Sequence, residues 1–285
     1  MFDQKKVKEL VLTTLVADSY SLGAHWIYDE NQLTNAKIDW NELNKPLAIW
    51  HKEKGAGEFT HYGDQAYWLY EFLLDKETFD EEEYLEYWTS KMKSYEGYID
   101  GATRITLDNI KNNLVPSGSE STDLSVVGRI VPLLLVSKTK EEFLTNVEKF
   151  TKLTHNSIKA LNATKFFGKV LWLALEGKDT ESAILSIKDE FDTKIQGFIE
   201  NGFKSKNDDS FDTIRNFGPA CDVDEGFAGI IHILSKYDNL KDMMICNAKA
   251  GGDSSARAMI ASAIFMANEP ISQIPQNWLA IKVTI

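Results

Sequence analysis

Two glycines stand directly before an aspartate in the segment KAGGDSSARAMIASAIFMA. Gly251 and Gly252 can let the backbone approach a ligand closely, and Asp253 opens a predicted helix whose first N–H groups have no partner inside the helix. Ser255 adds a hydroxyl ligand, and Arg257 lies four residues after Asp253 on the same helix face. These features fit a metal or phosphate site, and they also fit a plain helix cap.

A second carboxylate, Asp18, lies on the apolar stripe of the predicted first helix, three residues after Leu15. A buried carboxylate is costly unless it is hydrogen-bonded, paired or bound to a metal. The alternative interpretation is that the helix ends near this position and that Asp18 lies at its rim. The sequence leaves both interpretations open.

The segment GEFTHYGDQAYW carries a third set of polar side chains. Asp64 lies near the start of a predicted helix after Gly63, where a carboxylate complements the helix dipole. An aspartate after a glycine is also a common helix cap. His61 is a candidate acid–base group, although a single histidine is more often structural than catalytic.

A polar loop and the apolar run after it contain Asp123, Ser125 and Arg129. Arg129 can grip a phosphate through two N–H groups, or it can pair with a neighbouring acid. His155 follows Thr154 at a predicted helix end, where a histidine can simply cap free carbonyls.

The elements that must position these groups are helical almost throughout. Apolar residues recur at spacings of three and four, and capping boxes at Asp80…Glu83 and Thr139…Glu142 mark two helix starts. Clean alternation of apolar and polar residues is nearly absent. The sequence therefore predicts an all-α fold.

Two segments, 31–61 and 117–123, interrupt the helical pattern, and the polar residues 201–212 predict a surface loop. The chain contains no internal repeat, low-complexity linker or composition shift that would mark a boundary. We therefore predict a single domain over residues 1–285, with long functional loops.

The composition of the 285 residues is that of a soluble globular protein, with 43% hydrophobic and 26% charged residues. A formal net charge of -12 argues against a nucleic-acid backbone or an anionic membrane as the main partner. Cys221 and Cys246 form no CxxC pair and indicate reduced thiols. Because the first residues lack the apolar core of a signal peptide, we expect a cytoplasmic protein, of undetermined oligomeric state.

Taken together, these segments resemble the ADP-ribosylglycohydrolase family. VADSYSLGAHWIYD is similar to its first-helix signature, and GEFTHYGDQ occupies the place of its Thr-Asp-Asp-Thr motif. VVGRIVPLLL resembles its Met-Arg-x-x-Pro segment, AGGDSSARAMIASAIFMA its Gly-Gly-Asp-Thr-Asp-Thr helix, and IPQNW its closing Ile-Pro-x-x-Trp. The resemblance covers nearly the whole chain in the right order. It implies a single orthogonal helical bundle with the ligand in a central cleft.

Relatives that hydrolyse ADP-ribosyl bonds hold two Mg²⁺ ions through two of these motifs, and this sequence departs from both. The second motif keeps Asp253, but Ser255 replaces its other aspartate. In the first motif, His61 and Tyr62 replace both aspartates if there is no gap, whereas a shift of one residue brings Asp64 to a ligand position. Mg²⁺ prefers carboxylates and water, so the resemblance implies a reduced site, with one ion rather than two or with none.

Three functions follow as expectations from the resemblance. The first is a hydrolase that cleaves an N- or O-glycosidic bond of an ADP-ribosyl or related nucleotide-sugar, small or protein-linked, with carboxylate- or metal-activated water. The second is a catalytically weakened protein that binds a nucleotide-sugar without cleaving it. The third is a crystallin-like structural protein.

For the hydrolase, we expect Asp64, Asp253 and Asp18 to be catalytic, and Asp64, Asp253 and Ser255 to be the ligands of Mg²⁺. The residues expected to line the substrate pocket are His25, Trp26, His61, Asp123, Ser125, Arg129, His155, Gly251, Gly252 and Arg257.

Overall fold

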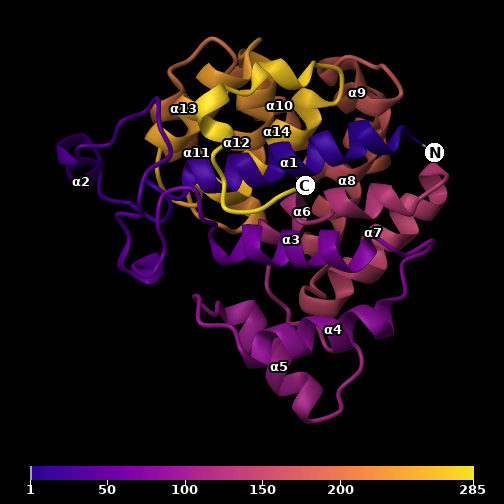
Figure 1. Cartoon of the computed structure of the whole chain (residues 1–285). Coiled ribbons are helices and arrows are strands. Elements are labelled where there is room, and N and C mark those ends of the chain that lie inside the picture. Colours follow the sequence, from indigo (N-terminus) through magenta and orange to yellow (C-terminus); the bar gives the residue numbers. More distant parts are fainter. Residues whose placement is uncertain (1) are drawn as a thin grey trace.

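The computed structural model describes residues 2–285, which fold into helices without any sheet (Figure 1). Within these residues the only β-type pairings are three isolated bridges, so the predicted all-α orthogonal bundle is confirmed. The α-helices are α1 (Gln4–Ser21), α2 (Glu30–Asn35), α3 (His61–Leu73), α4 (Glu81–Lys93), α5 (Gly101–Lys111), α6 (Ser125–Gly128), α7 (Lys140–Thr154), α8 (Ile158–Leu175), α9 (Thr180–Ile187), α10 (Thr193–Lys204), α11 (Ser210–Phe217), α12 (Val223–Lys236), α13 (Leu240–Lys249) and α14 (Ser254–Met266). Short 3₁₀ helices are η1 (Ile49–His51), η2 (Val131–Leu135), η3 (Lys188–Glu190), η4 (Ile271–Gln273) and η5 (Gln276–Leu279).

Aspartate side chains begin most of the α-helices, because a carboxylate oxygen accepts an N–H that has no partner inside the first turn. The predicted helix starts at Asp80 and Thr139 are confirmed: Asp80 accepts from the amide of Glu83 at 2.9 Å, and Thr139 from that of Glu142 at 3.1 Å. The capping aspartates are Asp3, Asp29, Asp80, Asp100, Asp179, Asp192, Asp209, Asp222 and Asp253.

The core of the fold is the pair α1 and α14, which pack along each other. Figure 1 shows α1 passing across the middle of the molecule with α14 behind it. Every residue of α14 except Phe265 is buried. Its alanines and serines leave little bulk between the two helices, so their backbones can approach closely at native packing density. Helix α14 is therefore a buried central helix of the fold.

Helix boundaries differ from the prediction at two places. Helix α3 begins at His61 instead of after Gly63, because Thr60 caps it by accepting from the amide of Tyr62 at 3.1 Å. The predicted loop 201–212 is mostly helical, since α10 runs to Lys204 and α11 begins at Ser210. Between the two helices, residues 206–209 are exposed and form a short surface connection.

Helix α1 continues past Asp18 to Ser21, so the carboxylate lies inside a helix and is fully buried. The interpretation of Asp18 as a rim residue is therefore wrong. The irregular segment 31–61 contains α2 and η1, and it brings a histidine, His51, into the centre of the protein.

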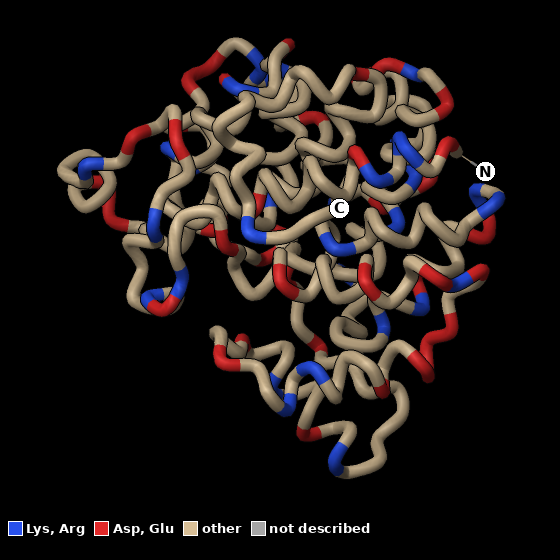
Figure 2. The backbone as a smooth tube through the Cα atoms, viewed as in Figure 1, with Lys and Arg blue, Asp and Glu red and all other residues tan. Residues whose placement is uncertain are grey.

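Basic and acidic residues are interspersed along the chain, and no continuous basic stripe is seen in the view of Figure 2. None of the helices in residues 2–285 combines the length and the apolar character needed to span a bilayer. The absence of a nucleic-acid partner stays a prediction.

Candidate functional site

The site lies where the end of α1, the start of α3, the loop before α6 and the start of α14 meet. Asp253 is its central carboxylate. It is fully buried and caps α14 by accepting from the amide of Ala256 at 3.0 Å. Its other oxygen accepts from the phenol of Tyr62 at 2.9 Å. Burial raises the pKa of Asp253, because a low-dielectric surrounding disfavours the charged form.

A second carboxylate, Asp123, comes within 4.8 Å of Asp253, together with the thiol of Cys221. Two backbone hydrogen bonds join the loop of Asp123 to that of Cys221, from Leu124 to the Cys221 carbonyl at 2.8 Å and from Val223 to Thr122 at 2.9 Å. This pairing fixes the carboxylate and the thiol side by side at the wall of the site.

The electrostatics of the carboxylate pair favour one shared proton. Burial and the charges of Asp253 and Asp100 together raise the pKa of Asp123 to about 7, although the amide of Ser125, which donates to Asp123 at 2.7 Å, acts in the opposite direction. Burial also raises the pKa of the Cys221 thiol, which therefore stays protonated. Two carboxylates this close cannot both ionise without a large cost.

Asp18 holds three elements together beneath this pair. One oxygen accepts from the amide of Thr60 at 2.8 Å, and the other accepts from the Thr60 hydroxyl at 2.6 Å and from the hydroxyl of Ser255. Burial raises the pKa of Asp18 to about 6, although these hydrogen bonds act in the opposite direction. In this structure Asp18 positions the starts of α3 and α14.

Asp64 does not join the buried cluster. Its carboxylate accepts from Lys54 at 2.7 Å and from the phenol of Tyr95 at 2.6 Å. The structure thus brings Tyr62, and not Asp64, to Asp253. This arrangement favours the alignment without a gap, in which His61 and Tyr62 occupy the places of the family's aspartates.

His25 and Trp26 cover Asp253 from the end of α1. His25 is fully buried, and its Nδ1 atom lies 3.6 Å from Asp253. Burial lowers its pKa well below the usual range, so the ring is neutral. The half-buried ring of Trp26 stacks on it at a centroid distance of 4.7 Å.

The backbone of Trp26 has a φ of 60°, which is costly for a bulky residue. Its amide donates to the Gly252 carbonyl at 2.7 Å, and the Gly252 amide donates to Ile27 at 2.8 Å. These two bonds fix the strained residue against the glycine loop. Strain of this kind is concentrated at functional sites.

Gly251 and Gly252 allow other backbone segments of this protein to pack closely against them. Their φ angles are 68° and 59°, and a Cβ atom would lie 2.3 Å from the Ile27 carbonyl at Gly251 and 2.2 Å from the Pro219 carbonyl at Gly252. The predicted close approach is real, but the partner in this structure is the backbone of the protein itself.

The two predicted arginines are engaged inside the protein. Arg257 donates to Asn247 at 2.9 Å and to the carbonyls of Pro219 and Gly251 at 3.0 Å and 2.6 Å. It therefore holds the glycine loop in place. Burial lowers its pKa to about 10, so it stays charged.

Arg129 is buried and donates to Gln65 at 2.5 Å, and it lies 3.4 Å from Nδ1 of His155. Both arginine side chains are buried, so neither is exposed to solvent for contact with a phosphate. His155 is buried at the end of α7 as predicted, and burial lowers its pKa to about 3.

Comparison with known proteins agrees with this arrangement of motifs. The family model described as ADP-ribosylglycohydrolase matches residues 2–281. The chain belongs to the ADP-ribosylglycohydrolase family. Crystallin J1A of Tripedalia cystophora is 22% identical over 98% of this chain and 92% of its own length. Crystallin J1B of the same organism is 21% identical over 96% and 91%.

A solved structure titled "ADP-ribosylglycohydrolase-related protein complex" has the same fold, with a TM-score of 0.76 and 17% identity over 96% of this chain and 91% of that one. The resemblance recognised in the sequence is confirmed at the level of family and fold.

The donor set does not suit the two-Mg²⁺ centre that the family implies. Each of the three residues at the places of family aspartates donates to, or contacts, a remaining carboxylate of this chain. Tyr62 donates to Asp253, Ser255 donates to Asp18, and His61 contacts Asp100 at 3.1 Å. Two divalent ions about 3.5–4 Å apart need several carboxylates to neutralise them.

A single ion at Asp123, Asp253 and Cys221 would have a protonated thiol as its third donor, which a hard cation such as Mg²⁺ disfavours. Asp64 and Ser255 are directed to other partners. The expectation of bound Mg²⁺ stays a prediction, and these residues fit it poorly.

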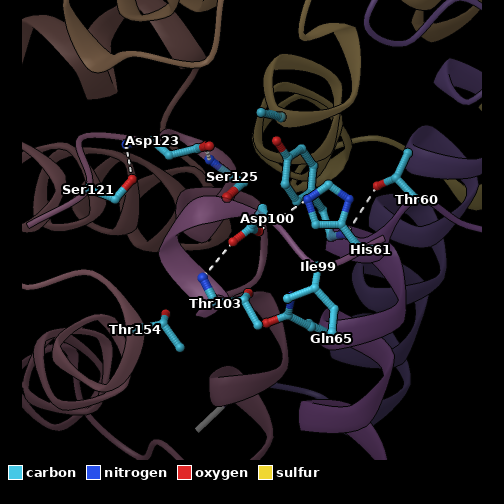
Figure 3. Close-up of polar contacts among 12 residues, drawn as sticks. Thr60, His61, Gln65, Ile99, Asp100, Thr103, Ser121, Asp123, Ser125 and Thr154 are labelled. Carbon is cyan, nitrogen blue, oxygen red and sulfur yellow. Dashed lines mark hydrogen bonds and ion pairs between the residues drawn. The ribbon is translucent and has the colours of Figure 1, made fainter. Parts of the chain in front are cut away.

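Four residues of the site were not predicted from the sequence: His51, Tyr98, Asp100 and Cys221. The signal for His51 was its place inside the irregular segment 31–61. For Asp100 it was an aspartate before Gly101 at a helix start. Figure 3 shows Asp100 between His61 and the loop that carries Asp123 and Ser125.

Proposed function

We propose that this protein hydrolyses an N- or O-glycosidic bond of an ADP-ribosyl or related nucleotide-sugar, with Asp123 and Asp253 as the carboxyl pair that protonates the leaving group and stabilises the transition state. The observation that carries the proposal is the approach of the two carboxylates to within 4.8 Å inside the site. Membership of the family supports the class of substrate.

The pair suits glycosidic hydrolysis because this reaction needs one protonated and one ionised carboxyl group. The transition state resembles an oxocarbenium ion, which a neighbouring carboxylate stabilises, while a carboxylic acid protonates the leaving group. Burial and mutual repulsion raise the pKa of Asp123 to about 7. One proton therefore stays on the pair near neutral pH.

The test is release of ADP-ribose from ADP-ribosylated protein and from small ADP-ribose conjugates, in Mg²⁺ and in EDTA. Asp253→Asn should lower turnover at least about 100-fold, because it removes one carboxyl group of the pair. The Asn side chain can still cap α14, so folding should persist. The matched control is Asp179→Asn, which changes an exposed aspartate that caps α9 at 2.9 Å in the same way.

Turnover in EDTA that depends on Asp253 would support the proposal. Turnover only with Mg²⁺ would overturn the assignment of the carboxyl pair and support the metal prediction. Turnover that is unchanged in Asp253→Asn would also overturn it.

A second candidate is a protein that binds a nucleotide-sugar without cleaving it, or a crystallin-like structural protein. The observation that favours it is that His61, Tyr62 and Ser255 replace carboxylates, while both curated relatives named above are crystallins. Calorimetric titration with ADP-ribose in Mg²⁺ and in EDTA separates these functions. Binding of ADP-ribose without turnover indicates a nucleotide-sugar-binding protein. The absence of binding indicates a crystallin-like structural protein.

A further inference from the structure

Three buried groups from distant parts of the chain form a continuous chain of contacts. Nε2 of His61 lies 3.1 Å from a carboxylate oxygen of Asp100, and Nδ1 of His61 lies 3.2 Å from Nε2 of His51. Figure 3 shows His61 and Asp100 facing each other. Both histidines are completely buried, and Asp100 is 7% exposed. They come from η1, the first residue of α3 and the cap of α5.

The protonation of this chain follows from its carboxylate end. Burial pushes the pKa of Asp100 upward, but the contact with His61 and the hydrogen bond from the amide of Thr103, at 2.6 Å, lower it well below its usual range. Asp100 is therefore ionised and can only act as a hydrogen-bond acceptor toward Nε2 of His61. Nε2 of His61 lies at hydrogen-bond distance from Asp100 but is poorly aligned with it, and it has no other partner among the described residues. Catalytic hydrogen bonds are often poorly aligned before substrate binds.

The remaining protons are then fixed by elimination. A neutral His61 that carries its proton on Nε2 has a bare Nδ1, which accepts from Nε2 of His51. This leaves Nδ1 of His51 without a proton. That atom is buried and has no hydrogen-bond partner among the described residues. A buried bare nitrogen of this kind is costly unless a ligand or water donates to it.

The contacts among His51, His61 and Asp100 also provide a favourable place for the positive charge that forms when His51 takes a proton. Burial, together with His25, His61 and Lys54, lowers the pKa of His51 to about 2, so a cation confined to His51 is unfavourable. If His51 takes a proton at Nδ1 and passes its Nε2 proton to Nδ1 of His61, the cation forms on His61. There it lies against the ionised Asp100, where the opposite charge stabilises it.

His51 lies at the aromatic side of the site. Its ring is 5.2 Å from that of Trp26, 5.9 Å from that of Tyr98 and 5.4 Å from that of His25. Trp26 and Tyr98 are half-buried, and His25 is 3.6 Å from Asp253. His25 therefore lies close both to His51 and to Asp253 of the carboxylate pair.

We propose that His51 is the general base of the hydrolysis proposed above, and that His61 and Asp100 are positioning residues that fix its tautomer. The inference rests on that proposed function. The oxygen of water bonds to the anomeric carbon while the glycosidic bond breaks, and its electron pair leaves with the aglycone. The water proton moves to Nδ1 of His51, and the carboxylate pair protonates the leaving group.

The first part of the test needs no turnover. In protein labelled with ¹⁵N-histidine, the Nδ1 resonance of His51 should have the shift of a bare nitrogen at neutral pH. Asp100→Asn, which keeps the cap of α5 and offers an N–H to His61, should reverse the chain and move that resonance to the protonated position. A protonated Nδ1 in the wild type would overturn the inference, whether or not the protein is a hydrolase.

The second part uses the wild-type substrate identified in the ADP-ribose release assay. His51→Gln and Asp100→Asn should each lower kcat about 100-fold or more and leave KM within about threefold, as loss of a general base does. The control is His232→Gln, which changes a buried histidine bonded to Ser205 and Ser210.

The outcomes separate the two proposals. A bare Nδ1 of His51 in a protein that cleaves no ADP-ribosyl bond would overturn the proposed function and the catalytic role with it, while the tautomer assignment would stand. Normal kcat in a folded His51→Gln variant of an active enzyme would overturn the inference alone.

Discussion

Replacing Asp18 by asparagine tests whether a buried carboxylate at the centre of the fold titrates near pH 6. Three groups donate to it: the amide and the hydroxyl of Thr60 and the hydroxyl of Ser255. Burial outweighs them and raises its pKa from 3.8 to about 6. Because the pKa is higher in the folded state, the contribution of Asp18 to stability is fully present below about pH 3.8 and is lost as the pH rises through 6.

The magnitude follows from the two pKa values. A difference of about two units corresponds to about 3 kcal/mol, and about 2–3 kcal/mol of it falls between pH 4 and pH 7.5. Asp18→Asn does not titrate. It also turns an N–H toward one of the three donors, which costs about 1–3 kcal/mol at every pH. The free-energy difference between wild type and variant should therefore shrink by about 2–3 kcal/mol from pH 4 to pH 7.5.

The assay is urea unfolding followed by tryptophan fluorescence at both pH values. Asp179→Asn is the control, because a hydrogen bond from Ser182 lowers the pKa of the exposed Asp179 and its contribution grows with pH. A difference between wild type and Asp18→Asn that is constant or widens with pH would refute the reasoning. A constant difference would mean that the three donors balance burial, and a widening difference would mean that they outweigh it.

Two further predictions concern residues next to Asp253. Gly252→Ala should lower the free energy of unfolding by about 3 kcal/mol, because φ is 59° and the new Cβ would lie 2.2 Å from the Pro219 carbonyl. Urea unfolding measures this loss. The control is Gly177→Ala, which has a φ of 92° and open space around it and should cost only about 1 kcal/mol. An equal cost at both glycines would contradict the clash. Tyr62→Phe removes the donor at 2.9 Å from a buried carboxylate and should cost about 1–3 kcal/mol in the same assay; an unchanged unfolding midpoint would show that the phenol does not stabilise Asp253.

The sequence allowed the fold and the segments of the site to be predicted, because both depend on local patterns. Helical periodicity and capping residues are local, and so is the glycine pair before Asp253. His25, His61 and Asp123 were assigned to the site from their segments, and the structure brings them near Asp253. The assignments at Asp64 and Ser255 depended on which neighbours these side chains meet, and Lys54 and Asp18 took them as partners.

The roles of His51 and Asp100 could not be predicted either, because they too depend on which side chains pack together in the folded protein. Each is a single polar residue in ordinary surroundings, a histidine in a loop and an aspartate at a helix cap. They become candidate site residues only because His61 lies between them in the folded protein, 3.2 Å from His51 and 3.1 Å from Asp100. Long-range packing decides that meeting, and no spacing in the sequence encodes it.

The three replaced motif residues carry a common chemical logic. In a metal centre, cations neutralise the carboxylates. Here Tyr62 and Ser255 donate hydrogen bonds to Asp253 and Asp18, and His61 contacts Asp100. A carboxylate stabilised by hydrogen-bond donors needs no ion to remain buried. Restoring one aspartate alone, as in Ser255→Asp, would therefore place two carboxylates in contact without recreating a metal site, because the other two positions would still carry donors.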